Sequence, residues 1–186
     1  NCRSSSERAW FDAALSRFSF PIPFHPWSQS PILTHGESLQ RMIEATSDEI
    51  IVLCDVDAFP IKYWWDDWIV EELAHKDAVA VVVDMPGRDM PVFLHPSFIA
   101  FKRRLLVDND LDVLTGEGND PAYKISRYLM SRGRMTQEHV TPLFPVRHAI
   151  PLFPQGTGKL FGRGDLRHGF GTTYSDWVFH FWFGMF

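Results

Sequence analysis

Two uninterrupted apolar segments constrain the fold of this chain most strongly: residues 50–54, IIVLC, and residues 78–83, AVAVVV. Neither segment alternates polar with apolar side chains, so each is predicted to be a strand that is covered on both faces. Segments with helical spacing lie beside both of them, at 34–49 and 61–76. This alternation predicts an α/β fold with a mixed, mostly parallel sheet flanked by helices.

The remaining segments extend this pattern. Helices are also predicted at 4–18 and 121–133, and a further strand at 98–101 turns into a helix near Arg103. Thr34, with Glu37 three residues later, predicts a capping box, and Asp120 before Pro121 predicts the N-cap of the 121–133 helix. Residues 20–27 and 140–153 are expected to be extended, and the Gly-rich segment 155–173 is expected to be a mobile loop.

Composition places the chain among ordinary globular proteins. Its 186 residues predict a single domain, 1–186, with 45% hydrophobic and 22% charged residues and a net charge of −5. The absence of a basic run argues against nucleic acid as a partner. With only two cysteines, of which Cys54 is predicted to be a small core residue, the expected location is the cytoplasm. The aromatic segment 177–186 is a candidate for core packing or for peripheral contact with a membrane, and the sequence gives no oligomeric state.

A cluster of aromatic residues, WWDDW, occupies positions 64–68. In a helix, Trp64 and Trp68 share one face and Trp65 lies off it. Core packing of this helix on the sheet is the prediction, with a sugar-stacking surface of aromatic rings as the alternative.

Two carboxylates follow the first apolar segment, at Asp55 and Asp57. Side chains two residues apart in a strand point to the same side, so the two carboxylates are expected to converge. They also lie at the carboxyl end of a strand, where open α/β sheets bind ligands. Hard oxygen ligands suit Mg²⁺ or Mn²⁺, and such an ion commonly bridges to substrate phosphates. The alternative is that both aspartates cap a turn in water.

The segment EATSDEIIVLCDVDAFPI, residues 44–61, resembles the D-x-D region of glycosyltransferases of the GT-A fold. Four other segments resemble parts of that family in the same order: NCRSSSE at 1–7, HPSFIAFKR at 95–103, GNDPAYKISRYLMSRG at 118–133 and YSDWVFHFW at 174–182. The resemblance implies a GT-A-like, Rossmann-like sheet. No apolar strand precedes the first predicted helix, so the chain is expected to lack the first strand of that sheet.

The resemblance also implies a metal centre. Asp55 would face the ribose and diphosphate of a nucleotide sugar and would share the metal with Asp57, and His180 would be the third protein ligand. An imidazole ligand favours Mn²⁺ over Mg²⁺. The alternative for His180 is a packed residue of an aromatic cluster, because Phe179 and Phe181 flank it.

Three more residues would lie near the nucleotide by position in the family: Asn1, His35 and Gly36. A turn-and-cap role explains His35 and Gly36 equally well.

Asp120 would be the general base of an inverting reaction. It would take the proton from the acceptor hydroxyl as that oxygen attacks the anomeric carbon. Other acidic side chains compete for this role: Asp108, Asp110, Asp112 and Glu117.

The expected function is therefore transfer of a sugar from a nucleoside-diphosphate sugar to a hydroxyl of a saccharide or a lipid-linked acceptor. One alternative is a phosphatase of the haloacid-dehalogenase type, with Asp55 as nucleophile and Asp57 as acid/base. The other is a degenerate sugar-binding domain without catalytic activity.

Overall fold

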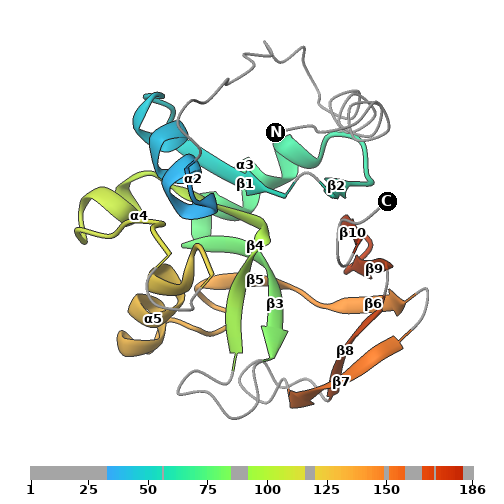
Figure 1. Cartoon of the computed structure of the whole chain (residues 1–186). Helices are drawn as coiled ribbons and strands as arrows, with labels where there is room; N and C mark the ends of the chain where they lie inside the picture. The colour runs from blue at the N-terminus through green and yellow to red at the C-terminus, as the bar shows by residue number, and fades with distance from the viewer. Residues whose placement is uncertain are drawn as a thin grey trace.

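The computed structural model describes residues 33–55, 57–84, 92–115, 120–148, 151–157, 165–169 and 171–181 (Figure 1). Several predictions lie outside these residues: the helix at 4–18, the extended segment 20–27, the nucleotide contact of Asn1 and the role of Glu117. None of the described helices combines the length and apolar character needed to cross a lipid bilayer.

The larger sheet contains β1 (Ile50–Cys54), β3 (Ala78–Asp84), β4 (Val92–Lys102) and β5 (Val140–Leu143), in the order β1-β4-β3-β5. β4 runs antiparallel to both β1 and β3, and only β3 and β5 are parallel. The prediction of a mostly parallel, Rossmann-like sheet is therefore wrong. Continuous apolar runs indicate that both faces of a strand are covered, but they carry no information about strand direction. Here seven residues separate the end of β3 from the start of its neighbour β4, fewer than the dozen or more that the crossover between parallel strands requires.

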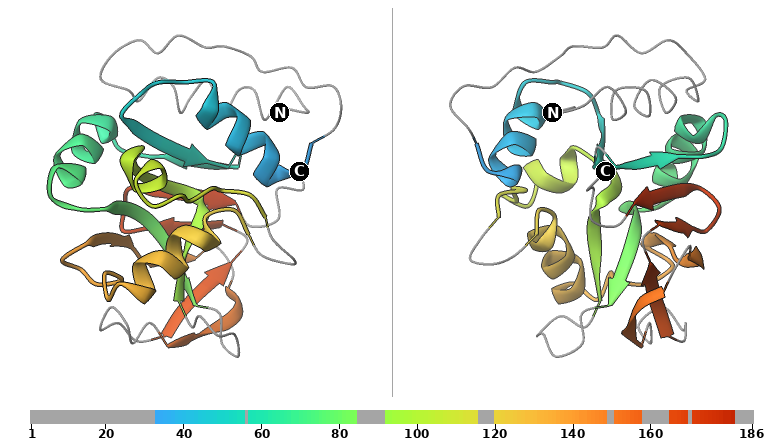
Figure 2. Two further views of the ribbon diagram at one scale, coloured as in Figure 1. Left: turned by 90° about the vertical axis from the view of Figure 1, so that its left-hand side faces the viewer. Right: turned by 45° about the vertical axis from the view of Figure 1, so that its right-hand side comes forward.

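Both faces of this sheet are covered, as the apolar runs predict. Val82 of β3 packs on the face that carries α2 (His35–Glu44), α4 (Arg104–Val107) and α5 (Tyr123–Ser131). Val81 packs on the opposite face, against α3 (Trp65–His75) and residues of the second sheet. Figures 1 and 2 show the two layers on either side of β3 and β4. Because neighbouring β3 residues face opposite layers, β3 joins the two halves of the core.

The start of α2 confirms the predicted capping box. The backbone N–H of Thr34 donates to Glu37 Oε2 at 2.8 Å, and the N–H of Glu37 donates to Thr34 Oγ1 at 3.3 Å. These two bonds satisfy backbone donors that the first helical turn leaves without partners.

The other two predicted helix starts need correction. Trp64 is the left-handed N-cap of α3 and is 66% exposed, whereas Trp65 is buried at 4%. Trp64 therefore does not share a helical face with Trp68, but the predicted core packing of this helix is confirmed, through Trp65, Ile69 and Leu73. The N-cap of α5 is Ala122 without a side-chain bond, so the predicted cap by the Asp120 side chain is also wrong. Instead, the Asp120 carbonyl accepts a bond from the Tyr123 N–H at 3.2 Å.

The second sheet is made of short strands: β2 (Ala58–Pro60), β10 (Val178–Phe181), β9 (Gly171–Tyr174) and β6 (Pro145–His148), in the order β2-β10-β9-β6. Its strands come from distant parts of the chain, since β2 pairs with β10. A further pair, β7 (Pro151–Thr157) and β8 (Asp165–Gly169), is antiparallel. The predicted mobile loop at 155–173 is thus wrong where β7, β8 and β9 occupy it.

A stacked tryptophan pair joins the second sheet to α3. The rings of Trp68 and Trp177 are 3.9 Å apart with an interplanar angle of 8°, and Lys62 Nζ lies 4.1 Å from the centroid of the Trp177 ring. Trp177 directly precedes β10, so this stack fixes the start of the strand that carries His180.

Candidate metal centre

Asp55 and Asp57 lie on the tight connection between β1 and β2. The N–H of Asp55 donates to the Ser97 carbonyl of β4 at 3.0 Å, and the N–H of Ala58 donates to the Asp55 carbonyl at 3.0 Å. The chain therefore turns directly after β1. The prediction that both carboxylates project from one strand is wrong, because β1 ends at Cys54 and Asp57 belongs to the turn. Cys54 itself is exposed rather than part of the core.

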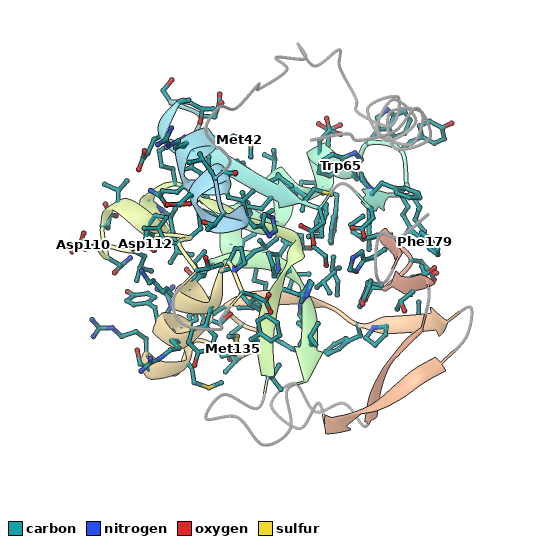
Figure 3. All side chains as sticks on the ribbon, in the orientation of Figure 1. Met42, Trp65, Asp110, Asp112, Met135 and Phe179 are labelled. Atoms are coloured by element: carbon teal, nitrogen blue, oxygen red, sulfur yellow. The ribbon has the colours of Figure 1, made fainter. Side chains whose placement is uncertain are left out.

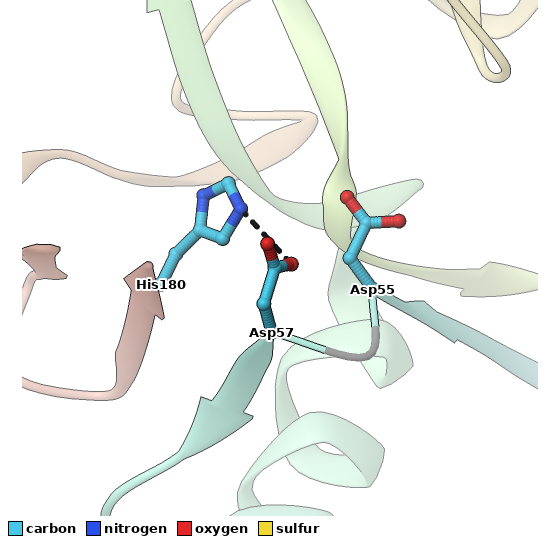
Figure 4. A group of neighbouring side chains, drawn as sticks. All are labelled: Asp55, Asp57 and His180. Carbon is cyan, nitrogen blue, oxygen red and sulfur yellow. Dashed lines mark ion pairs between the residues drawn. The ribbon is translucent and has the colours of Figure 1, made fainter. Parts of the chain in front are cut away.

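The side chain of His180 reaches this turn from the other end of the chain. His180 lies opposite Ala58 in the β10–β2 pair, which places it beside Asp57. It is buried at 5%, and its Nε2 atom is 3.4 Å from Asp57 Oδ1. Figure 4 shows the imidazole directed at the Asp57 carboxylate, with Asp55 on the far side of Asp57.

The three side chains form a donor set that fits a divalent cation. One ligand atom from each of Asp55, Asp57 and His180 lies within 4.8 Å of the other two. Two carboxylate oxygens and one imidazole nitrogen suit Mn²⁺, and the carboxylates also suit Mg²⁺. Three protein ligands would leave coordination positions for water or for substrate oxygens.

The electrostatics of Asp55 favour a neighbouring positive charge. Burial raises the pKa of the Asp55 carboxyl; the histidines His35 and His180 oppose this effect, and the carboxylates Asp57 and Asp120 add to it. A bound cation would stabilise the ionised form of the Asp55 carboxylate, which burial and the neighbouring carboxylates disfavour.

Two other predicted residues act electrostatically on the same carboxylate. His35, at the first turn of α2 and 51% exposed, has its Nε2 atom 3.4 Å from Asp55 Oδ1. Asp120 is near enough to act on the pKa of Asp55. The structure thus brings His35, Asp55, Asp57, Asp120 and His180 into one region, although Asp120 and His180 are 60 residues apart in the sequence.

Gly36 has a clear packing role. A Cβ atom built at this position would lie 2.5 Å from the backbone nitrogen of Thr115 and 3.0 Å from the carbonyl oxygen of Val113. Only a glycine lets α2 approach the 113–115 segment this closely. A nucleotide contact by Gly36 stays a prediction, as does the one by His35.

The described acidic residues that compete with Asp120 occupy other surroundings. Asp112 accepts two bonds from Lys124 Nζ, at 2.6 and 2.7 Å. Asp108 is the exposed C-cap of α4. Asp110 and Asp112 lie on the opposite side of the molecule from Phe179, the neighbour of His180 (Figure 3). Of the four candidates that the structure describes, Asp120 is the one whose charge acts on Asp55.

His95 and Ser97 also belong to this region, although the sequence patterns do not point to them. The imidazole rings of His95 and His180 are 5.9 Å apart, and the Ser97 carbonyl binds the Asp55 N–H. The signal that could have revealed them is Pro96: proline inside a strand marks an edge or a bulge, and bulges frequently redirect side chains beside a site.

Comparisons of the chain with family models, with curated proteins and with solved structures found no match.

Proposed function

We propose that this chain is a divalent-metal-dependent glycosyltransferase that moves a sugar from a nucleoside-diphosphate sugar to a hydroxyl acceptor. The observation that carries the proposal is the convergence of Asp55, Asp57 and His180, with Asp120 close enough to act on Asp55. The resemblance of residues 44–61 to the D-x-D region of glycosyltransferases supports the same reaction. The proposal rests on this group of side chains and not on the topology of the sheet.

Each side chain has a role in this reaction. Asp55, Asp57 and His180 would hold Mn²⁺ or Mg²⁺, which when bound offsets the charge of the diphosphate leaving group. Asp120 removes the proton from the acceptor hydroxyl, so that the oxygen attacks the anomeric carbon and the diphosphate departs from the opposite face. This order of events inverts the configuration of the anomeric carbon.

A thermal-shift titration tests donor binding. Mn²⁺ together with UDP-, GDP- or dTDP-linked sugars should raise the melting temperature for one nucleotide class, because a ligand that binds only the folded state stabilises it. CMP-linked sugars, which carry one phosphate, should produce no such shift. Asp57→Ala should abolish the shift. Asp108→Ala, which removes an exposed carboxylate at the end of α4, should leave it unchanged. The donor assignment is wrong if no nucleotide class shifts the melting temperature of well-folded wild-type protein.

A second assay separates transfer from the phosphatase alternative. Asp120→Asn should keep the donor-dependent thermal shift and lose most sugar transfer, because the general base contributes typically about 10²–10⁴-fold. A phosphatase that uses Asp55 as nucleophile would instead hydrolyse a generic phosphomonoester, with or without Asp120. Phosphomonoester hydrolysis without a donor-dependent shift would replace the transferase proposal.

A further inference from the structure

We propose that His95 is a positioning residue of the metal centre: it supports the His180 imidazole and thereby sets a preference for Mn²⁺ over Mg²⁺. This inference rests on the proposed function, because it concerns the same three metal ligands. It adds a residue of β4 to a centre that otherwise consists of the β1–β2 turn and β10.

A bulge in β4 brings His95 to this position. Along the β3–β4 pair, Ala80 lies opposite Ile99, whereas the next residue, Val81, lies opposite His95. Residues 96–98 of β4 therefore have no β3 partner. The bulge also changes which face the side chains meet, since Leu94 packs on the face of α2 and α5 and Phe98 packs on the opposite face.

The backbone of Ser97 connects this bulge to both sides of the centre. Its N–H donates to His95 Nδ1 at 3.1 Å, and its carbonyl accepts the N–H of Asp55 at 3.0 Å. The first bond fixes the orientation of the His95 ring and leaves Nε2 as the nitrogen that carries the proton in the neutral form. The second bond fixes the backbone from which the Asp55 carboxylate projects.

The His95 ring contacts two other rings. Its centroid is 5.5 Å from that of Phe93, at an interplanar angle of 62°, and 5.9 Å from that of His180, at 41°. His180 has its Nε2 atom 3.4 Å from Asp57, so Nε2 is the nitrogen available to a shared cation. A His95 ring held by Phe93 and by the Ser97 N–H therefore limits the rotation of the His180 ring away from Asp57.

The identity of the metal should depend on this support. Mg²⁺ binds chiefly through carboxylate and water oxygens, whereas a well-placed imidazole adds affinity for Mn²⁺. Loss of His95 should therefore weaken Mn²⁺ binding selectively, because the Asp55 and Asp57 oxygens remain in place. Residues that orient a metal ligand typically contribute about 10–100-fold to metal affinity.

Isothermal titration with Mn²⁺ and with Mg²⁺ tests the inference on wild-type protein and three variants. His180→Ala and His95→Ala should each lower Mn²⁺ affinity, the latter by about 10–100-fold, and both should leave Mg²⁺ affinity nearly unchanged. The matched control is His139→Ala. It removes another partly exposed histidine, which contacts Asp77 at 3.6 Å, and should change neither affinity.

His95→Asn is a second variant that tests the inference if His95→Ala fails to fold. Asparagine offers an oxygen acceptor to the Ser97 N–H but has no aromatic ring, so it should preserve the bulge and still lose Mn²⁺ affinity. The inference is overturned if folded His95→Asn keeps the wild-type ratio of Mn²⁺ affinity to Mg²⁺ affinity. It is also overturned if the variant loses affinity for both ions equally. In either of these two cases, a loss of Mn²⁺ affinity in His180→Ala would leave the proposed function intact and overturn only the role of His95. If wild-type protein binds neither ion, the proposed function fails as well.

Discussion

The two four-stranded sheets of this molecule differ in what their side chains do. In the larger sheet, β3 and β4 are almost entirely buried and mostly apolar, and their side chains fill the core on both faces. The second sheet has strands of three or four residues and carries buried polar side chains, among them Thr172 and His180. The larger sheet contains most of the large, fully buried apolar side chains, and the second sheet brings the His180 side chain to the turn that follows β1.

This difference teaches why the two sheets should respond differently to mutation. Apolar burial stabilises the fold without regard to ligands, whereas a buried carboxylate costs free energy until a cation or a hydrogen bond compensates it. Mutations in the larger sheet should therefore act on global stability. Mutations in the second sheet should act first on metal binding.

Phe101→Ala should have the largest effect on stability. Phe101 is fully buried in β4, opposite Ile51 on one side and Ala78 on the other. Its truncation leaves a cavity and should lower the free energy of unfolding by about 3–5 kcal/mol. Urea denaturation measures this loss, and a change below about 1 kcal/mol would show that the larger sheet is not the main source of stability.

Gly36→Ala should have the next largest effect on the stability of the fold. Alanine normally stabilises a helix by about 1 kcal/mol relative to glycine. Here its Cβ would lie 2.5 Å from the Thr115 nitrogen. The clash should dominate and destabilise the protein by about 1–3 kcal/mol in urea denaturation. A more stable variant would mean that the 113–115 segment yields easily and that α2 does not depend on this contact.

Trp177→Ala should affect the second sheet more than the first. It removes the stack with Trp68, and such aromatic pairs contribute about 0.5–1.5 kcal/mol beyond their buried area. Hydrogen exchange should accelerate in residues 171–181 and change little in β3. The exposed Trp64 provides a matched control, and Trp64→Ala should leave both regions unchanged. If hydrogen exchange accelerated equally in both sheets, the two sheets would not respond independently to this mutation.

Asp55→Asn should have the smallest effect on the free energy of unfolding, and it should raise the stability instead of lowering it. Burial raises the pKa of this carboxyl in the folded state, so its ionised form opposes folding at neutral pH. In the presence of a chelator, Asp55→Asn should be more stable than wild type at pH 7. The gain should shrink as the pH falls through the folded pKa and vanish below the ordinary aspartate pKa of about 4. Urea denaturation across this pH range measures it, with the exposed Asp48→Asn as control.

Local signals in the sequence predicted local structure well. The strand at 50–54 and the capping box of Thr34 and Glu37 are both present. Each depends on side chains within a few residues of one another. By contrast, strand direction depends on which distant segments pair, and the apolar runs are equally compatible with parallel and antiparallel neighbours.

The candidate site was predictable in part for the same reason. Asp55 and Asp57 were recognisable beside the apolar strand, and the family resemblance added His180. The geometry was not predictable, because the turn after β1 and the β2–β10 pairing bring these three residues together instead of a shared strand face. The position of His95 near His180 was not predictable, because it depends on a bulge in β4.

The most direct test of the metal centre is a Mn²⁺ titration followed by electron paramagnetic resonance, which reports the free aqueous ion. Wild-type protein should remove one Mn²⁺ per chain from solution, and Asp108→Asn should do the same. Asp57→Asn and His180→Ala should both lose this capacity while remaining folded. Equal Mn²⁺ binding in all four proteins, or none in the wild type, would contradict the assignment of Asp55, Asp57 and His180 as a metal site.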